Sequence, residues 1–422
     1  MIIEQREHKD FSDLQERPLE KHGRTISLIL PALNEYKTIG NYFPAFANLM
    51  ALGCIDEIII ADSSSDMRTI DAALESAVDT HPFSDMIHRS ISRGTPLPVK
   101  AVNVFDPTLT GIYNGHKPDI GTIPGKGTAM YLGMAIASGD ILIFLDSDFQ
   151  NIDPHFVYGL AGPFEDKRTI LSKATFELED TYQQVLDECA RLGTDPRYND
   201  TLLKSVNSRT LAKPMMETVD TKLEIFPGIS GFNGPLSGGV GAAKEVWHSL
   251  KIPKHYGIEV SYLMQLAKKF PNGHYAYDVN LGEVMQESQD AEGRVRMGQN
   301  IISTLLHHLQ HEQPALYEQW RQNPSQFTNI YLENAGKFAV HNSDPERMEL
   351  YAGIMTNILS NGERINVPIL PALNQNTLYL GKEEQFADLA NKVTIERINS
   401  HKAHSPTPTI LKRETVGTYA NG

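Results

Sequence analysis

The sequence predicts an α/β fold, with a mostly parallel, Rossmann-like sheet flanked by helices and followed by a helical C-terminal extension. Short runs rich in Ile, Val and Leu alternate with helical segments over the first 150 residues, the pattern of a doubly wound sheet. Each run ends in polar or small residues, so several polar loops are expected at one edge of the sheet. From about residue 298 onward, apolar residues recur at helical spacing.

The expected elements follow one another in order along the first part of the chain. Strands are expected at 25–30, 55–61, 99–105 and 141–145, and helices at 34–52, 67–77 and 126–138. Pro31 ends the first strand because proline has no backbone N–H to donate to a sheet. No G-x-G-x-x-G motif follows that strand, which disfavours a dinucleotide-binding sheet.

The chain is acidic, with 38 Lys and Arg against 52 Asp and Glu and a formal net charge of −14. This balance disfavours binding to nucleic acid or to anionic membranes. The two cysteines, Cys54 and Cys189, form no disulfide framework. Residues 1–23 have no apolar signal core and no run reaches the length of a membrane span. We therefore expect a cytoplasmic protein without nucleic-acid or membrane partners, which needs local basic residues or a metal to handle anionic substrates.

Asp146-Ser147-Asp148 comes directly after the apolar run 141–145. In an open α/β sheet, ligands bind at the carboxyl ends of the strands. Two carboxylates there are suited to Mg²⁺ or Mn²⁺, which take one or two carboxylates together with substrate phosphate oxygens. A motif this short also occurs by chance in unrelated sequences, so its interpretation depends on the neighbouring segments.

Lys126 lies between two glycines in the segment Pro124–Gly127, at the expected start of a helix. Glycines let the backbone approach a phosphate, and a lysine at a helix N-terminus adds a point charge. The alternative is a solvated turn lysine. The position just before the Asp-x-Asp strand favours phosphate binding.

As an ordered set, these segments resemble the donor site of the GT-A glycosyltransferases, and more narrowly the glucosyl-3-phosphoglycerate synthases and their mannosyl relatives. The resemblance covers about residues 25–310. It is carried by Pro31–Glu35, Asp62-Ser63, Pro124–Gly127, Asp146–Asp148, Asn233–Gly239, Tyr256–Glu259 and Val279–Gly282.

The resemblance implies a role for each matching residue. Asp148 would ligate the metal, and Glu259 with Tyr256 would hold the transferred sugar, so Asp148 and Glu259 are the expected catalytic residues. The expected donor-binding residues are Pro31, Ala32, Leu33, Asn34, Glu35, Asp62, Ser63, Lys126, Asp146, Ser147 and Tyr256. Leu236, Ser237 and Gly238 would lie between donor sugar and acceptor. Asn34 and Asp62 also have simpler interpretations, as a helix N-cap and a turn-forming residue.

The resemblance further implies retention of anomeric configuration by front-face attack, in which the leaving phosphate helps to deprotonate the acceptor. On that model no nucleophilic carboxylate is required, unlike in the retaining glycosidases. The metal would act as a Lewis acid on the departing diphosphate.

Two departures from the family pattern concern the metal and the acceptor. Where the family has a metal-ligand His after Val-Asn-Leu-Gly, this chain has Gln286, whose carbonyl oxygen is a possible second ligand. In the acceptor segment, Val206 replaces an Arg, leaving Lys204 and Ser208 as expected acceptor-binding residues. Other cations are available as substitutes for the Arg: Arg209, Arg294 and Arg296. Alternatively, the acceptor lacks the phosphate.

We therefore expect a retaining glycosyltransferase that moves glucose from a nucleotide sugar, UDP-glucose, to 3-phosphoglycerate with Mg²⁺ or Mn²⁺. The same chemistry on glycerate or glycerol, or with a mannosyl donor, is the nearest alternative. A non-catalytic sugar-nucleotide-binding protein is an alternative of another class. A nucleotidyltransferase is disfavoured because its Gly-rich loop would follow the first strand directly. The resemblance also suggests a homodimer.

The expected organisation has five regions. They are a lead-in (1–24), a nucleotide-sugar-binding half (25–150), an acceptor-binding half (151–297), a helical extension (298–400) and a flexible tail (401–422). His307, His308 and His311 lack a carboxylate at fixed spacing, so a solvated helix face is expected there. His255 is expected near the active site because it adjoins Tyr256.

Overall fold

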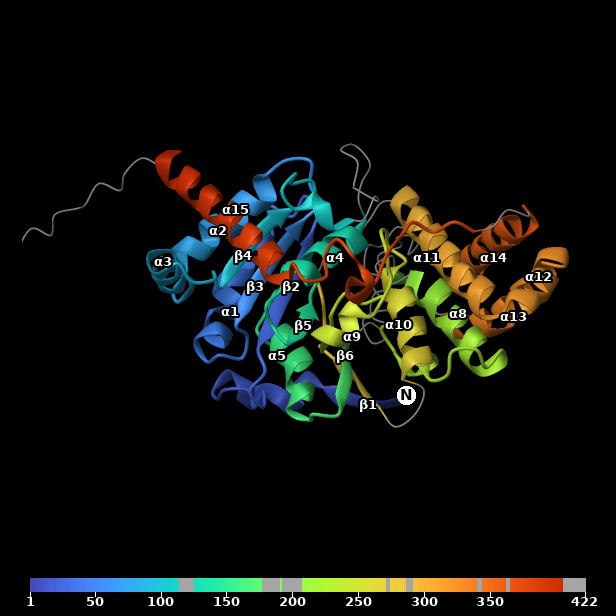
Figure 1. Ribbon diagram of the computed structural model, residues 1–422. Helices are drawn as coiled ribbons and strands as arrows, with labels where there is room; N and C mark the ends of the chain where they lie inside the picture. Colours follow the sequence, from blue (N-terminus) through green and yellow to red (C-terminus); the bar gives the residue numbers. More distant parts are fainter. Residues whose placement is uncertain are drawn as a thin grey trace, which may run out of the picture.

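The computed structural model describes residues 1–113, 125–176, 190–191, 207–270, 274–285, 291–339, 344–361 and 365–404. Its α/β part and a helical part lie side by side (Figure 1). The main sheet has eight strands in the order β1-β9-β6-β7-β5-β2-β3-β4. Their bounds are β1 Ile2–Glu7, β2 Ile26–Ala32, β3 Glu57–Asp62, β4 Val99–Asn103, β5 Ile141–Phe144, β6 Thr169–Thr175, β7 Val240–Ala243 and β9 Tyr275–Asn280.

Helices cover both faces of this sheet and build the second part (Figure 1). In the α/β part they are α1 Tyr42–Ala51, α2 Arg68–Asp79, α3 Phe83–Arg93, α4 Lys126–Ile136, α5 His155–Ala161, α9 Lys244–His248 and α15 Glu383–His404. In the helical part they are α8 Lys213–Glu217, α10 Ile258–Lys269, α11 Ala291–Glu312, α12 Pro314–Gln322, α13 Ser325–Ala335 and α14 Asp344–Ser360. Among the described helices none has the length and apolar character needed to cross a bilayer.

The central strands are apolar on both faces because each face has its own core. Successive side chains of a strand point to opposite faces, so Ile29 and Ile59 enter one hydrophobic cluster. Leu28 and Ile58 enter the other. This explains why β2 and β3 read as continuous apolar runs, as is typical of buried parallel strands.

The strand register brings the polar loops to one edge, as predicted. Ala32 at the end of β2 is level with Asp62 at the end of β3. Phe144 at the end of β5 is level with Ile29 of β2. β7 runs antiparallel to both of its neighbours, β5 and β6, so the sheet is mixed but mostly parallel. The predicted fold class is confirmed.

Local boundaries differ from the expected ones in several places. β2 continues through Pro31 to Ala32, so Pro31 does not end the strand as expected. The helix expected from residue 34 begins only at Ile39, with the 3-10 turn η2 (Ile39–Asn41) before α1. Asn34 has a left-handed backbone (φ 64°), which ends β2 in a loop instead of starting a helix. The helix α3 was not expected from the sequence.

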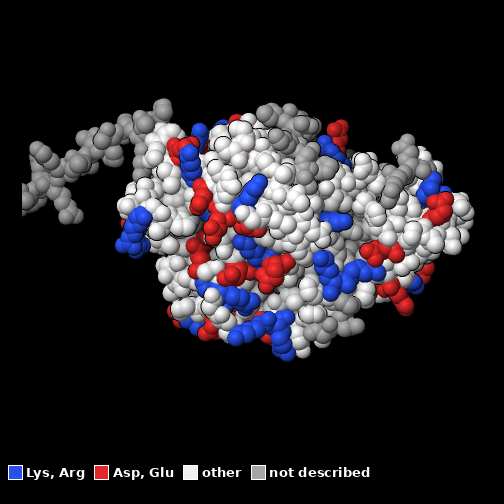
Figure 2. All heavy atoms as spheres, in the orientation of Figure 1, with Lys and Arg blue, Asp and Glu red and all other residues white. Residues whose placement is uncertain are grey.

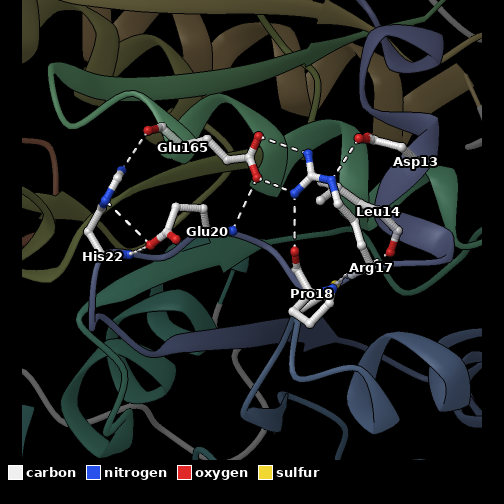
Figure 3. Close-up of polar contacts among 8 residues, drawn as sticks. Asp13, Leu14, Arg17, Pro18, Glu20, His22 and Glu165 are labelled. Atoms are coloured by element: carbon white, nitrogen blue, oxygen red, sulfur yellow. Dashed lines mark hydrogen bonds and ion pairs between the residues drawn. The ribbon is translucent and has the colours of Figure 1, made fainter.

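The N-terminal residues, expected to be a lead-in, form part of the sheet. β1 pairs in parallel with β9 along its whole length, and the edge position explains its polar sequence. The following 3-10 segment η1 (His8–Gln15) leads to Arg17, which bonds Asp13 at 2.7 Å and Glu165 at 2.6 Å. Figure 3 shows Glu165 also accepting from the backbone N–H of Glu20. These contacts fasten the N-terminal segment to the turn before β6.

The C-terminal extension returns to the α/β part after its helices. β10 (Ile369–Leu370) pairs antiparallel with β8 (Ile252–Pro253), and α15 then lies along β4. Thr394 Oγ1 accepts from the Ala101 N–H at 3.0 Å and lies 3.3 Å from the Ala101 carbonyl. β4 is the outer strand of the sheet, so α15 covers an edge that would otherwise expose unpaired backbone groups.

Candidate active site

The Asp-x-Asp turn is held by buried hydrogen bonds through its middle residue. Ser147 Oγ donates to the Pro31 carbonyl at 2.7 Å, and the Ser147 carbonyl accepts from Thr38 Oγ1 at 2.8 Å. Tyr42 adds a third bond, donating its hydroxyl to the Asp146 carbonyl at 2.7 Å. These bonds join the loop after β2 to the loop after β5, so the two predicted donor segments form one rigid unit.

Lys126, Asp146 and Glu259 meet at the centre of the site. The Lys126 ammonium lies 2.5 Å from Asp146 Oδ1 and 2.8 Å from Glu259 Oε1. Burial opposes its charge, but Asp146 and Glu259 outweigh burial and hold the pKa of Lys126 well above its ordinary value. Three side chains from three elements, all selected from the sequence, therefore form one charged cluster. Its two carboxylates and single ammonium leave it net negative.

Glycines at three positions let backbone approach this cluster closely. A Cβ on Gly127 would lie 1.7 Å from the Pro253 carbonyl oxygen, and one on Gly125 would lie 2.5 Å from the Cα of His255. The glycines beside Lys126 thus allow its loop to lie against residues 253–255, a packing role besides the expected approach to phosphate. A Cβ on Gly238 would lie 2.1 Å from both carboxylate oxygens of Asp146.

Asp148 is a buried carboxylate that forms no ion pair with any residue that the structure describes. Burial, followed by the neighbouring Asp146 and Glu35, raises its pKa to about 7, while Lys126 lowers it. Its Oδ1 is buried and has no hydrogen-bond partner among the described residues. An oxygen in this state fits a hard divalent cation, which supplies both a partner and positive charge.

The described residues contain no group of three or more His, Cys, Asp or Glu suited to hold a metal. Mg²⁺ commonly combines one or two carboxylates with substrate oxygens and water, and Asp148 would supply such a carboxylate. Gln286, the expected second ligand, lies outside the described residues. The chain just before it is placed beside Asp148, because the Gln150 N–H bonds the Met285 carbonyl at 2.7 Å.

The loops after β2 and β3 are linked to each other through a serine. The Asn34 N–H donates to Ser64 Oγ at 2.7 Å. Asn34 is not a helix N-cap, because the first helical turn after β2 begins at Ile39 with Thr38 at its N-cap position. Asp62 is fully buried and accepts from Ser64 Oγ at 2.6 Å and from Asn103 Nδ2 at 3.2 Å. Burial raises the pKa of Asp62 to about 6. These bonds agree with the turn-forming interpretation of Asp62, whereas Ser63 Oγ is buried with no partner among the described residues.

Residues 253–257 close the site opposite the loop of Lys126. Burial raises the pKa of Tyr256 and lowers that of His255 to about 4. The Gly257 N–H donates to His255 Nδ1 at 3.1 Å, so the neutral imidazole carries its proton on Nε2. His255 was expected near the active site, and its backbone lies against Gly125, next to Lys126.

The predicted acceptor residues are only partly described. Leu236, Ser237 and Gly238 reach Asp146 through Gly238, and Ser208 begins the π-helical turn Ser208–Ala212. Lys204 lies outside the described residues. Arg209, one of the substitute cations, forms a buried two-bond ion pair with Asp344, at 2.9 and 3.0 Å, so it ties this region to α14.

The expected solvated face is found only at His311, which is exposed, whereas His307 and His308 are partly buried. His308 Nε2 lies 2.9 Å from Ser261 Oγ of α10, and His307 Nδ1 lies 3.2 Å from the Ile365 carbonyl. Burial lowers the pKa of His308 to about 3. The correction follows from packing of α11 against α10 and the returning chain, which sequence spacing alone does not show.

One buried residue at the site was missed from the sequence. Lys173 of β6 is fully buried, and its ammonium donates to the Ser237 carbonyl at 2.7 Å and to the Tyr262 hydroxyl at 2.9 Å. A lysine inside the strand segment Thr169–Thr175 was the available signal, because buried lysines are rare without a specific partner.

A cavity of about 490 Å³ lies next to the donor loops. It is lined by residues at the ends of β3 and β4, including Ser64 and Asn103, and by Glu396 and Arg397 of α15. Lys126, Asp146 and Asp148 do not line it, so the charged cluster is separate from this cavity. The drawn face shows acidic and basic side chains side by side (Figure 2).

A mostly parallel sheet with an Asp-x-Asp turn, a lysine and a glutamate converging at its carboxyl edge is typical of one class, the glycosyltransferases of GT-A fold. Comparisons with known proteins show which glycosyltransferases the chain is similar to. No family model matches it. The glucosyl-3-phosphoglycerate synthase of Mycobacterium tuberculosis is 28% identical over 304 residues, covering 71% of this chain and 78% of that protein. The Petrotoga mobilis enzyme of the same name is 25% identical over 307 residues, covering 72% and 79%.

Solved structures similar to the chain were also found. Mannosyl-3-phosphoglycerate synthase from Rubrobacter xylanophilus has a TM-score of 0.51 at 22% identity, covering 73% of this chain and 81% of that one. The M. tuberculosis glucosyl-3-phosphoglycerate synthase with Mn²⁺, UDP and phosphoglyceric acid has a TM-score of 0.47 at 27% identity, covering 70% and 81%. It has also been solved with Mg²⁺ and UDP.

These comparisons confirm the predicted resemblance and, with the sheet topology, the predicted GT-A fold. They also confirm the expected kind of protein, a glycosyltransferase enzyme. The predicted ions, Mg²⁺ and Mn²⁺, both occur in structures of similar proteins.

Proposed function

We propose that the chain transfers glucose from UDP-glucose to the free hydroxyl of 3-phosphoglycerate, with retention of configuration and with Mg²⁺ or Mn²⁺. The observation that carries this proposal is the cluster of Lys126, Asp146 and Glu259 beside the orphaned oxygen of Asp148. The substrates are inferred from the synthases to which the chain is similar along 71% of its length.

Lys126 would bind the donor diphosphate. Its ammonium stands at the N-terminus of α4, where backbone N–H groups and the helix dipole also favour an anion. With no donor bound it is neutralised by Asp146 and Glu259. A bound diphosphate would pair with the Lys126 ammonium, so that both carboxylates could bind other partners. Asp146 could then accept from ribose or from metal-bound water, and Glu259 from sugar hydroxyls.

Asp148 would hold the cation, together with Gln286 as a proposed second ligand. When bound, the cation would supply positive charge that stabilises the departing diphosphate. The residues of the chain keep the site fixed around it, because Ser147 and Tyr42 bond the turn that carries both aspartates.

The proposed mechanism is front-face attack, as the resemblance implies. It needs no carboxylate nucleophile, unlike the retaining glycosidases, so Asp146 and Glu259 are left to bind the donor. In the proposed step the bond from sugar to phosphate breaks and the acceptor oxygen bonds to the same face of the anomeric carbon. The acceptor proton passes to an oxygen of the leaving phosphate.

The acceptor would lie against Leu236–Gly238, whose backbone rests on Asp146. Lys204, Ser208 and the α11 cations are the proposed anion partners, because Arg209 is engaged by Asp344. Asn207 bonds the Arg294 carbonyl at 2.9 Å, so the start of α11 lies beside Ser208. If the acceptor is unphosphorylated, these cations are less needed and glycerate or glycerol would serve.

An acceptor panel tests the proposal. Purified protein with Mg²⁺ is given UDP-glucose or GDP-mannose, each with 3-phosphoglycerate, glycerate or glycerol, and products are separated by ion exchange. Product from UDP-glucose and 3-phosphoglycerate alone supports the proposal. Product only with another pair moves the specificity to that pair. Tight UDP binding without product from any pair favours the non-catalytic alternative, a sugar-nucleotide-binding protein.

We also propose that the protein is a cytoplasmic homodimer, on the basis of the resemblance. Light scattering of the purified chain tests the assembly, and a mass of about 47 kDa, that of one chain, would contradict it.

A further inference from the structure

Lys173 lies in the middle of the sheet, far from water. Its strand, β6, is paired with β9 on one side and β7 on the other. Lys173 is level with Asp278 of β9, yet its ammonium donates to Ser237 and Tyr262 instead. The buried ammonium thus bonds a loop carbonyl although a carboxylate lies on the neighbouring strand. This choice of partner indicates that Lys173 positions the loop.

The loop that Lys173 holds is the one that touches the catalytic cluster. The Ser237 N–H donates to the Gly234 carbonyl at 3.1 Å, which closes a turn just before Gly238. Gly238 follows and lies against the Asp146 carboxylate. Gly239 then accepts from the Ala174 N–H, next to Lys173, at 2.8 Å. Lys173 and Ala174 thus fix both sides of the residue that rests on Asp146.

The charges around Lys173 come from every element packed against it. Glu259 on α10, Asp278 on β9 and Asp146 after β5 favour its charged form, and Lys126 on α4 opposes it. Burial is the largest effect and lowers the pKa of Lys173 to about 7. The Tyr262 hydroxyl stays neutral, since burial raises its pKa well above the ordinary value.

Both protonation states of Lys173 can keep both hydrogen bonds. The ammonium donates to the Ser237 carbonyl and to the Tyr262 oxygen. The neutral amine donates to Ser237 and accepts from the Tyr262 O–H. The fold therefore survives deprotonation, but the bond to Ser237 weakens, because a hydrogen bond from a charged donor is about twice as strong as a neutral one.

We propose that Lys173 is a positioning residue for glycosyl transfer, which holds the Leu236–Gly238 loop on Asp146 so that the acceptor hydroxyl faces the anomeric carbon beside the leaving phosphate. This inference rests on the proposed function. Lys173 touches neither donor nor acceptor; it acts through the Ser237 carbonyl. Its grip is strongest when it is charged and weakens as the pH rises through neutrality.

Kinetics of Lys173→Met and Lys173→Arg test this role. Lys173→Met is expected to raise the acceptor KM on the order of tenfold and to increase hydrolysis of UDP-glucose relative to transfer, with the Kd for UDP unchanged. Wild-type acceptor KM should rise between pH 6 and 8.5, whereas it should be flat in Lys173→Met and stay low in Lys173→Arg. Equal losses in acceptor KM and UDP affinity would overturn the proposal, since they indicate general disruption of the site.

A matched control keeps the lysine and removes its other partner. Tyr262→Phe deletes one hydroxyl but leaves the charge and the bond to Ser237, so acceptor KM at pH 6 should stay within about threefold of wild type. A loss in Tyr262→Phe as large as in Lys173→Met would mean that packing around Tyr262, and not the grip on Ser237, matters.

Hydrogen exchange in the unaltered protein tests the grip without any turnover. After correction for intrinsic exchange rates, protection of the amides of residues 237–239 should fall on the order of tenfold from pH 6 to 8.5. Unchanged protection would overturn the inference. If protection falls but wild-type protein turns over no acceptor, the proposed function fails while the hold of Lys173 on the loop stands.

Discussion

Replacing Lys126 by Met tests its two roles, neutralising the nearby carboxylates and binding the donor diphosphate. In the free protein its ammonium neutralises Asp146 and Glu259, at 2.5 and 2.8 Å. With donor bound it would contact the diphosphate. Met keeps the length of the apolar stem and removes only the charge and the hydrogen-bond donors, so both effects should be visible in one variant.

The expected magnitudes follow from burial and charge. Hydrogen bonds to charged groups contribute roughly 1.5–3 kcal/mol, so the Kd for UDP with Mg²⁺ should rise about 10- to 150-fold. Removing one member of a buried ion pair costs about 3–5 kcal/mol. The side chains of Lys126, Asp146 and Glu259 are 14%, 24% and 7% exposed, so a loss of unfolding free energy near the lower figure is expected.

Calorimetry of UDP binding and urea unfolding measure the two effects. The double variant Lys126→Met/Glu259→Gln removes one of the two unpaired carboxylate charges, so it should recover stability without recovering UDP affinity. Lys37→Met is the matched control, because Lys37 is an exposed lysine that forms no ion pair with Asp146 or Glu259 and should change neither quantity. A normal Kd for UDP in Lys126→Met would refute the reasoning, as would recovery of affinity in the double variant.

Three further predictions concern packing, metal and pH. Gly238→Ala should cut kcat/KM at least about 100-fold, because its Cβ would lie 2.1 Å from the Asp146 carboxylate, while Gly111→Ala, with nothing within 4 Å, should be silent; equal activity in the two variants would contradict the close approach. Asp148→Asn should abolish Mg²⁺-dependent turnover, measured by product formation against Mg²⁺ concentration, whereas the exposed Asp79→Asn should not; near-normal turnover would remove Asp148 as the ligand. Burial keeps His308 neutral in the folded protein and lowers its pKa to about 3, so unfolding free energy is lost as pH falls below the unfolded value of about 6.5, by roughly 2 kcal/mol at pH 5. In His308→Gln, urea unfolding at pH 7 and 5 should show a loss of unfolding free energy that is smaller by this amount. The same pH dependence as in the wild type would show that His308 titrates normally in the folded protein.

The sequence predicted those parts of the fold and site that depend on local pattern. Strands β2, β3, β4 and β5 were found because each is an apolar run that ends in polar residues. Lys126, Asp146 and Glu259 were selected separately along 134 residues of sequence, and the structure brings them within hydrogen-bond distance of one another. Parallel strands share a carboxyl edge, so residues that follow different strands can be predicted to meet.

Features set by partners distant in sequence could not be predicted. β1 has a polar sequence and is a strand only because β9 lies beside it. The place of α15 depends on the uncovered edge of β4, where Thr394 reaches Ala101. Residues 1–7 were accordingly expected within a lead-in and residues 383–400 within a helical extension, with no partner assigned. The helix α15 continues to His404, past residue 400, where a flexible tail was expected to begin.

Single buried polar contacts were also beyond the sequence. Nothing in the helical spacing of His308 shows that Ser261 lies against it. Lys173 reads as an ordinary strand lysine until Ser237 and Tyr262 are placed around its ammonium. The left-handed Asn34 depends on the Ser64 hydroxyl, which explains why a helix expected from residue 34 begins at Ile39.

The anomeric configuration of the product directly tests the proposal that glucose is transferred with retention. UDP-glucose and 3-phosphoglycerate are incubated with the protein and Mg²⁺, and the coupling of the anomeric proton in the isolated product is measured by NMR. We expect a glucosyl-3-phosphoglycerate with the same anomeric configuration as the donor. A product of inverted configuration, or UDP release without any glycosidic product, would contradict it.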